Sequence, residues 1–101
     1  MIAYRLSPAA EADLVGIWDY TAEQWDKDQA TRYVVAIRDR LDGIVAGRIP
    51  MRSAADVRPG YFKCAAGSHM LYFTRADNQT IDVIRILHQS MDVAGVFRDS
   101  R

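Results

Sequence analysis

Apolar side chains recur every three or four residues over two stretches of the chain, from Pro8 to Trp25 and from Ala30 to Val45. In an α-helix this spacing places the apolar side chains on one face. Each stretch therefore predicts an amphipathic helix. Because only a short polar segment at 26–28 separates them, the two helices are expected to pack antiparallel as a hairpin.

The residues that border these stretches are typical of helix ends. Ser7 can cap the free backbone N–H groups of the first helix, and Pro8 already has a helical φ. Asp28 is the expected cap of the second helix. That helix should end near Gly47, because glycine often follows the last turn and Pro50 cannot continue it.

The second half of the chain is rich in strand-forming residues bounded by polar turns, after an irregular basic loop at 48–60. Together with a loose apolar alternation at the N-terminus, this predicts four strands, at Ile2–Leu6, Tyr61–Ala65, His69–Arg75 and Thr80–His88. A short helix is expected at Ser90–Phe97, with Ser90 or Asp92 as its cap.

The last predicted strand is apolar on both faces. Alternation directs Ile81, Val83 and Leu87 to one face of the sheet. Ile84 and Ile86 then point to the opposite face. A strand that is buried on both faces is usually an internal strand of its sheet, so this segment is expected to have neighbours on both sides.

The order of these elements predicts an α+β fold. We expect a βααβββ sandwich, in which the helical hairpin packs on one face of a mostly antiparallel sheet, with a short C-terminal helix. The chain has 101 residues, of which 50% are hydrophobic, and this composition excludes a disordered chain. Residues 1–101 are expected to form one domain with a modest core, which leaves apolar surface for a partner chain.

The charges balance overall but are unevenly placed. Thirteen Lys and Arg residues meet thirteen Asp and Glu residues, which argues against a protein that coats nucleic acid by bulk electrostatics. Residues 1–46 hold eight acids and five bases, whereas residues 47–101 hold five acids and eight bases. This asymmetry points to a basic working face, with a chance partition of surface charge as the alternative. No sequence-specific DNA binding is expected.

Other classes of protein find little support. The single cysteine, Cys64, cannot form an internal disulfide, and no signal peptide or membrane-spanning run is apparent. The protein is therefore expected to be cytoplasmic and not bound to a membrane. His69, His88 and Cys64 lack the spacing of metal ligands, and no phosphate-binding loop is present, so neither a metal nor a cofactor is expected.

Five side chains on the later strands and the preceding loop form the candidate chemistry: Arg58, Lys63, His69, Arg85 and His88. A group of cations with a histidine could hold an RNA phosphate and move a proton, which is the minimum for cleavage through the 2′-hydroxyl. The alternative is that these are surface charges, with His88 a structural residue at the end of its strand.

The aromatic residues suggest both a core and a contact surface. Trp18, Trp25 and Tyr33 lie on the helical apolar stripes and are expected in the core. The pairs Tyr61-Phe62 and Tyr72-Phe73 lie on adjacent strands, so one member of each pair should be buried. The other member would meet the helices or a partner, and an open sheet edge would be a natural docking place for another chain.

Motifs over residues 4–97 resemble the ParE-like toxins of bacterial toxin–antitoxin pairs, within the ParE/RelE superfamily. The N-terminal motif is Leu6-x-x-x-Ala10-x-x-Asp13-Leu14-x-x-Ile17-x-x-Tyr20, with Trp25 and Gln29-Ala30-x-x-Tyr33. The C-terminal motifs are Arg58-Pro59-Gly60-Tyr61, Gly67-Ser68-His69, Tyr72 and Arg85-Ile86-Leu87-His88-x-x-Met91-Asp92. The last of these is the most specific.

The resemblance implies the same βααβββ fold and a partner, a ParD-like antitoxin that wraps the toxin and neutralises it. It also implies a target, since the ParE branch inhibits DNA gyrase by binding, whereas the RelE branch cleaves mRNA on the ribosome. RelE-like nucleases carry a tyrosine near the C-terminus, and this chain has none after Tyr72. We therefore expect a binding inhibitor without catalytic residues. The alternatives are a ribosome-dependent endoribonuclease and a non-toxic interaction module.

Two sets of contact residues follow from the resemblance and the pattern together. The residues expected to contact the target are Arg58, Lys63, Arg85, His88, Met91, Asp92 and Phe97. The residues expected to contact the antitoxin are Leu14, Trp18, Tyr33, Ile37 and Tyr72.

Overall fold

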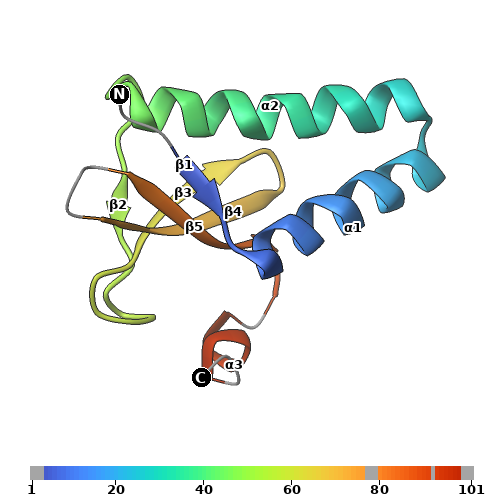
Figure 1. The fold of residues 1–101 in the computed structure, drawn as a ribbon. Helices are drawn as coiled ribbons and strands as arrows, with labels where there is room; N and C mark the ends of the chain where they lie inside the picture. Colours follow the sequence, from blue (N-terminus) through green and yellow to red (C-terminus); the bar gives the residue numbers. More distant parts are fainter. Residues whose placement is uncertain (1–3, 77–79, 92, 99–101) are drawn as a thin grey trace.

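A computed structural model describes residues 4–76, 80–91 and 93–98. Its elements, in chain order, are β1 (Tyr4–Leu6), α1 (Pro8–Gln24), α2 (Lys27–Val45), β2 (Arg52–Ser53), β3 (Phe62–Ala66), β4 (His69–Arg75), β5 (Ile81–His88) and α3 (Val93–Arg98). The predicted α+β fold is confirmed, with α1 and α2 packed as a hairpin on one face of the sheet (Figure 1). The possible cap Asp92 lies outside the described residues.

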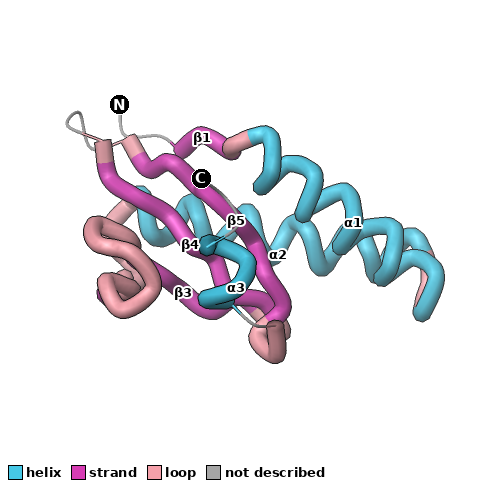
Figure 2. The backbone as a smooth tube through the Cα atoms, turned by 90° about the horizontal axis from the view of Figure 1, so that it is seen from below, coloured by secondary structure: helices cyan, strands magenta, loops and turns pink. Residues whose placement is uncertain are grey.

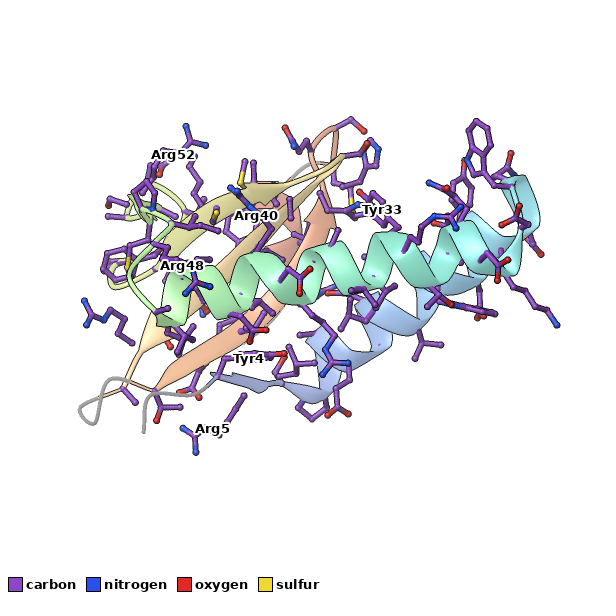
Figure 3. The ribbon with its side chains drawn as sticks, turned by 90° about the horizontal axis from the view of Figure 1, so that it is seen from above. Tyr4, Arg5, Tyr33, Arg40, Arg48 and Arg52 are labelled. Carbon is purple, nitrogen blue, oxygen red and sulfur yellow. The ribbon has the colours of Figure 1, made fainter. Side chains whose placement is uncertain are left out.

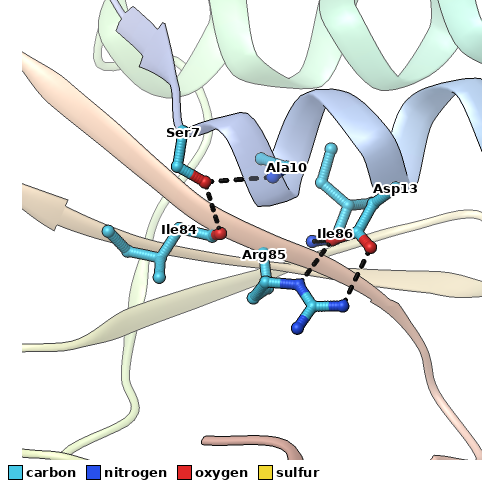
Figure 4. A network of polar contacts seen from close by, with 6 residues as sticks. All are labelled: Ser7, Ala10, Asp13, Ile84, Arg85 and Ile86. Atoms are coloured by element: carbon cyan, nitrogen blue, oxygen red, sulfur yellow. Dashed lines mark hydrogen bonds and ion pairs between the residues drawn. The ribbon is translucent and has the colours of Figure 1, made fainter. Parts of the chain in front are cut away.

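Helix α1 begins as the sequence predicts and is anchored to the sheet at its first turn. The Ser7 hydroxyl oxygen accepts a hydrogen bond from the Ala10 backbone N–H at 3.0 Å. The same hydroxyl donates to the Ile84 carbonyl of β5 at 2.7 Å. One side chain therefore caps the helix and fixes its position on the sheet (Figure 4).

Helix α2 begins two residues earlier than predicted, so the assignment of Asp28 as its cap is wrong. Asp26 has an extended backbone, and its carboxylate accepts from the Gln29 backbone N–H at 2.7 Å. Asp28 lies inside the first turn, where its charge interacts favourably with the helix dipole. Only Trp25 and Asp26 separate the two helices, which forces the hairpin to close tightly.

The five-stranded sheet has the order β1-β5-β4-β3-β2. β1 pairs with β5 in parallel, and the other neighbours are antiparallel. β5 thus lies between two strands, which confirms that it is internal. The two-residue strand β2 was predicted as loop, because a segment this short leaves no alternation in the sequence.

A β-bulge interrupts the pairing of β4 with β5. Tyr72 lies opposite Arg85, but the next residue, Phe73, lies opposite Val83, so that Ile84 is extra on β5. An extra residue reverses the alternation of the side chains that follow it.

The bulge makes the predicted facing of Ile86 and Leu87 wrong. Ile86 packs with Ile81 and Val83 in the core beneath the helical hairpin. Leu87 joins Ile84 on the opposite face of the sheet. Strict alternation from Ile81 holds only as far as the bulge, and a bulge has no signature in the sequence of this strand.

The sheet has a hydrophobic core on each face. The larger core, which includes Ile37, Leu41 and Phe73, lies between the sheet and the hairpin. The smaller core lies on the other face, over which α3 passes (Figure 2). It includes Tyr72 and Phe97, together with Tyr61 from the loop before β3. The short C-terminal helix therefore adds a third layer. None of the described helices is long and apolar enough to cross a membrane.

Candidate partner-binding groove

A groove of about 620 Å³ runs between the hairpin and the open edge of the sheet. Its walls come from α1 and the start of α2 on one side, and from β5, the β3–β4 turn and Met91 on the other. Tyr20 and Trp25 line it although they are 65% and 76% exposed. Large apolar side chains that gather in an open groove are typical of a site for a partner chain.

Trp25 was expected in the core, and that prediction is wrong. It is the residue at which α1 ends, at the tip of the hairpin. The hairpin extends beyond the sheet at this tip (Figure 1), so no strand among the described elements lies beneath the helical stripe there. Ile17, in the same stripe, is 8% exposed because it packs in the larger core.

The wall of the groove that β5 forms includes an unpaired strand edge. β1 covers β5 only over 81–83, and the Asp13 carboxylate then accepts from the Ile86 backbone N–H at 2.9 Å. The N–H and carbonyl of one strand residue point to the same side, and the direction alternates along the strand. The Ile86 carbonyl and the His88 N–H therefore face the groove, where an added segment can reach them. The His88 carbonyl already accepts from the Met91 backbone N–H at 3.0 Å.

Asp13 also holds Arg85, which makes this cation unlike the free surface charge that the sequence suggested. The two carboxylate oxygens of Asp13 accept from Nε and Nη2 of Arg85 at 2.8 and 3.0 Å (Figure 4). Their side chains are only 14% and 23% exposed. The hydrogen bond to Asp13 raises the pKa of Arg85, despite the opposing effect of burial. Arg85 therefore enters the groove with its charge already paired.

The structural role of Asp13 was missed. The sequence analysis named Asp13 only as one position of the N-terminal motif and assigned it no contact. Its position beside Leu14 and Ile17 on the apolar stripe was the available signal, because an acid on a buried face needs a partner.

Tyr33 links α2 to the turn between β3 and β4. Its hydroxyl oxygen accepts from the Ser68 backbone N–H at 2.9 Å, so its own proton is available to His69 Nδ1 at 2.7 Å. Figure 3 shows Tyr33 on the side of α2 that lies near this turn. His69 in turn lies opposite His88 in the sheet, with ring centroids 5.4 Å apart.

The environment of His69 favours the neutral ring. Burial lowers its pKa below the ordinary value, the nearby His88 lowers it further, and Asp13 opposes both. In the unfolded chain His69 takes up a proton at a higher pH than in the folded protein. Between these two pKa values the unfolded state binds more protons, so stability is lost as the pH falls.

We predict that wild type loses unfolding free energy between pH 7.5 and pH 5.5, and that His69→Gln loses less. Glutamine keeps a polar group near the Tyr33 hydroxyl but has no group that titrates in this range. The measurement is urea unfolding at both pH values. His88→Gln is the control: it removes only the smaller cause, so part of the pH dependence should remain. An unchanged pH dependence in His69→Gln contradicts the assignment.

The residues proposed to contact the target lie on both faces of the sheet. Arg85, His88 and Met91 line the groove. Arg58 and Phe97 belong to the opposite face, while Asp92 lies outside the described residues. Lys63 is half-buried on β3, where it lies opposite Arg52 of β2.

Phe97 is 2% exposed and joins the smaller core. Its ring packs edge-on against Tyr61 and Tyr72, with centroids 5.3 and 5.2 Å away. Arg58 donates from Nη2 to the Phe97 carbonyl at 3.1 Å. In this structure both residues hold α3 on the sheet, so Phe97 can reach a target only if α3 leaves it.

Of the residues proposed to contact an antitoxin, Tyr33 lies in the groove. Leu14 packs against the larger core, and Trp18 donates from Nε1 to the Thr31 hydroxyl at 3.3 Å. Ile37 and Tyr72 are 1% and 4% exposed and serve packing. Periodicity selects apolar positions, but it does not separate those beneath the hairpin from those beyond the edge of the sheet.

Comparison with solved structures shows where the same fold occurs. The fold is similar to a chain of the chromosomal ParDE toxin–antitoxin system from Pseudomonas aeruginosa, with a TM-score of 0.71 and 20% identity, over 87% of this chain and 96% of that one. It is also similar to a chain of the RelBE2 toxin–antitoxin complex from Mycobacterium tuberculosis, with a TM-score of 0.58 and 18% identity, over 87% and 98%. This chain therefore shares its fold with a chain of each of these two toxin–antitoxin structures.

Sequence comparison then gives the family. The model of the ParE toxin of the type II toxin–antitoxin system parDE matches residues 4–93. Toxin ParE1 of Mycobacterium tuberculosis is 46% identical over 90 residues, which cover 89% of this chain and 92% of the relative. Toxin ParE of Escherichia coli is 30% identical over 93 residues, which cover 92% and 90%. This chain belongs to the ParE toxin family, which confirms the resemblance in its motifs.

Proposed function

We propose that this chain is the toxin of a ParDE pair, that a ParD-like antitoxin neutralises it, and that the free toxin inhibits DNA gyrase by binding. The observation that carries the proposal is the family match over residues 4–93, together with 46% identity to a ParE1 toxin. RNA cleavage on the ribosome and a non-toxic interaction module are the alternatives.

The state of the cations supports binding over phosphate chemistry. Cleavage of RNA needs a cation that is free to hold the phosphate as charge develops on it. Arg85 donates both of its described hydrogen bonds to the Asp13 carboxylate. Arg58 donates to the backbone of α3. Both arginines therefore stabilise the fold through these contacts. This favours a protein that recognises its target by surface shape over one that cleaves RNA.

The groove is the proposed docking place of the antitoxin. It combines exposed aromatic residues, Tyr20 and Trp25, with a strand edge at Ile86 and His88. An amphipathic segment can cover such a surface, because its apolar side chains fill the groove while its backbone pairs with the strand edge. A bound antitoxin would also cover Arg85, His88 and Met91, which line the groove and are proposed to contact the target.

The test is a DNA gyrase supercoiling assay with the purified chain, run beside an mRNA cleavage assay in an in vitro translation mixture. We expect inhibited supercoiling, intact message, and recovery of supercoiling when a purified ParD-like antitoxin is added. Cleaved message with unaffected supercoiling would support the endoribonuclease. Normal growth on induction of the chain alone would support the interaction module.

A further inference from the structure

Gly16 is a glycine in the middle of a 17-residue helix, and it lines the groove. Glycine inside a helix costs about 1 kcal/mol relative to alanine, because it loses more backbone entropy on folding. The position is exposed on the groove side of α1. Because glycine destabilises α1, we look for a contact outside the helix that requires a residue without a side chain.

Other glycines of this chain have such a reason within the fold. A Cβ on Gly43 would clash with the Ile49 side chain. A Cβ on Gly67 would lie 2.7 Å from the Tyr33 hydroxyl, and its φ of +59° is unfavourable for other residues. Apart from its chain neighbours and the backbone of its own helix, a Cβ on Gly16 would meet no atom of the described residues within 4 Å. The fold itself therefore leaves the space over Gly16 open.

The surroundings of this open space indicate what would fill it. Gly16 lies one turn after Asp13, whose carboxylate accepts from the Ile86 backbone N–H of β5. It lies one turn before Tyr20, which is exposed. Ile17 and Met91 also line the groove. A side chain that enters here meets mostly apolar atoms, because the charges of Asp13 and Arg85 are already paired with each other. A large apolar side chain fits this environment best.

We propose that Gly16 is a specificity-determining position of the groove, which admits a large apolar side chain of the ParD-like antitoxin into the space that a Cβ and its substituents would occupy. The inference rests on the proposed function and adds to it the residue that selects the partner. Gly16 lowers the stability of α1, and on this proposal it is retained because a residue without a side chain lets the antitoxin side chain contact the helix.

The experiment uses Gly16→Ala and Gly16→Leu with a purified ParD-like antitoxin that binds the wild-type chain. Both variants should fold and unfold at a higher temperature than wild type, since both residues favour helix and the site is open. Binding should weaken in the order Gly, Ala, Leu, with a loss of about tenfold to a hundredfold for leucine, because the added atoms overpack the interface. Isothermal titration calorimetry measures the dissociation constant.

Ala9→Leu is the matched control. Ala9 is exposed on the first turn of the same helix and does not line the groove, so leucine there adds similar bulk without entering the interface. Its affinity should equal that of wild type. A second arm replaces the large apolar residues of the antitoxin with alanine one at a time. One such change should restore binding to Gly16→Leu while it weakens binding to wild type.

The outcomes separate the two levels of the argument. If wild type and folded Gly16→Leu bind the antitoxin equally, the role of Gly16 is refuted while the proposed function stands. If no ParD-like antitoxin binds the wild-type chain, the proposed function fails, and the role of Gly16 fails with it. Equal weakening by Ala9→Leu would show that bulk anywhere on α1 is harmful, which also refutes the selection by Gly16.

Discussion

Replacing Phe97 with alanine is expected to lower the free energy of unfolding by about 3 kcal/mol. The ring is 2% exposed and packs between Tyr61 and Tyr72. Truncation would remove the main apolar contact of α3 and leave a cavity in the smaller core. Urea unfolding followed by circular dichroism measures the loss. Val35→Ala is the control, since Val35 is 46% exposed and its truncation should cost little.

The variant also tests how α3 is held. If α3 detaches before the rest of the molecule unfolds, backbone amides of α3 in Phe97→Ala should exchange with solvent faster than those of β4 and β5. A loss of stability no larger than that of Val35→Ala would contradict the role of Phe97 in the smaller core. Gyrase inhibition that disappears while the fold persists would support the proposal that Phe97 contacts the target.

Asp13→Ala is the second large effect, with an expected loss of about 2 to 4 kcal/mol. The change would leave the largely buried Arg85 guanidinium without its partner and the Ile86 backbone N–H without its acceptor. The cost therefore combines an unpaired charge with a lost contact between α1 and β5. The midpoint of thermal unfolding gives a rapid measurement, and urea unfolding gives the free energy.

Asp82→Ala is its matched control. Asp82 also pairs with an arginine, Arg5, at 2.8 Å, but the side chains are 32% and 68% exposed. An ion pair in contact with water contributes roughly 0 to 1 kcal/mol. Equal losses in the two variants would contradict the argument that burial makes the Asp13 pair important.

The sequence predicted the order of the main elements because each carries a local signal. Periodicity located the helical hairpin, and the cap at Ser7 was correct because its serine and Pro8 act locally. Asp26 and Asp28 are both acceptable caps, so the choice between them depended on the path of the chain. The bulge at Ile84 depends on the pairing of two strands, which no single strand reveals.

The site was less predictable, since it depends on which surface each element presents. Arg85 was singled out from the sequence, but its pairing with Asp13 joins positions separated by 72 residues. Trp25 lies on the same stripe as Ile17, and only the overhang of the hairpin makes one exposed and the other buried. The open space beside Gly16 depends on which other segments pack near it. The presence of a glycine in the sequence does not reveal such a space.

The parallel pairing of β1 with β5 affects how the chain folds while the ribosome synthesises it. Arg5 and Asp82, which form an ion pair across these strands, are 77 positions apart, so β1 has no neighbour in the sheet until most of the chain has been synthesised. Contacts between distant positions form late and slow the folding of a chain. The groove, which β5 and Met91 line, is also completed late. A nascent chain is therefore expected to lack the groove that we propose for the antitoxin until β5 has left the ribosomal exit tunnel.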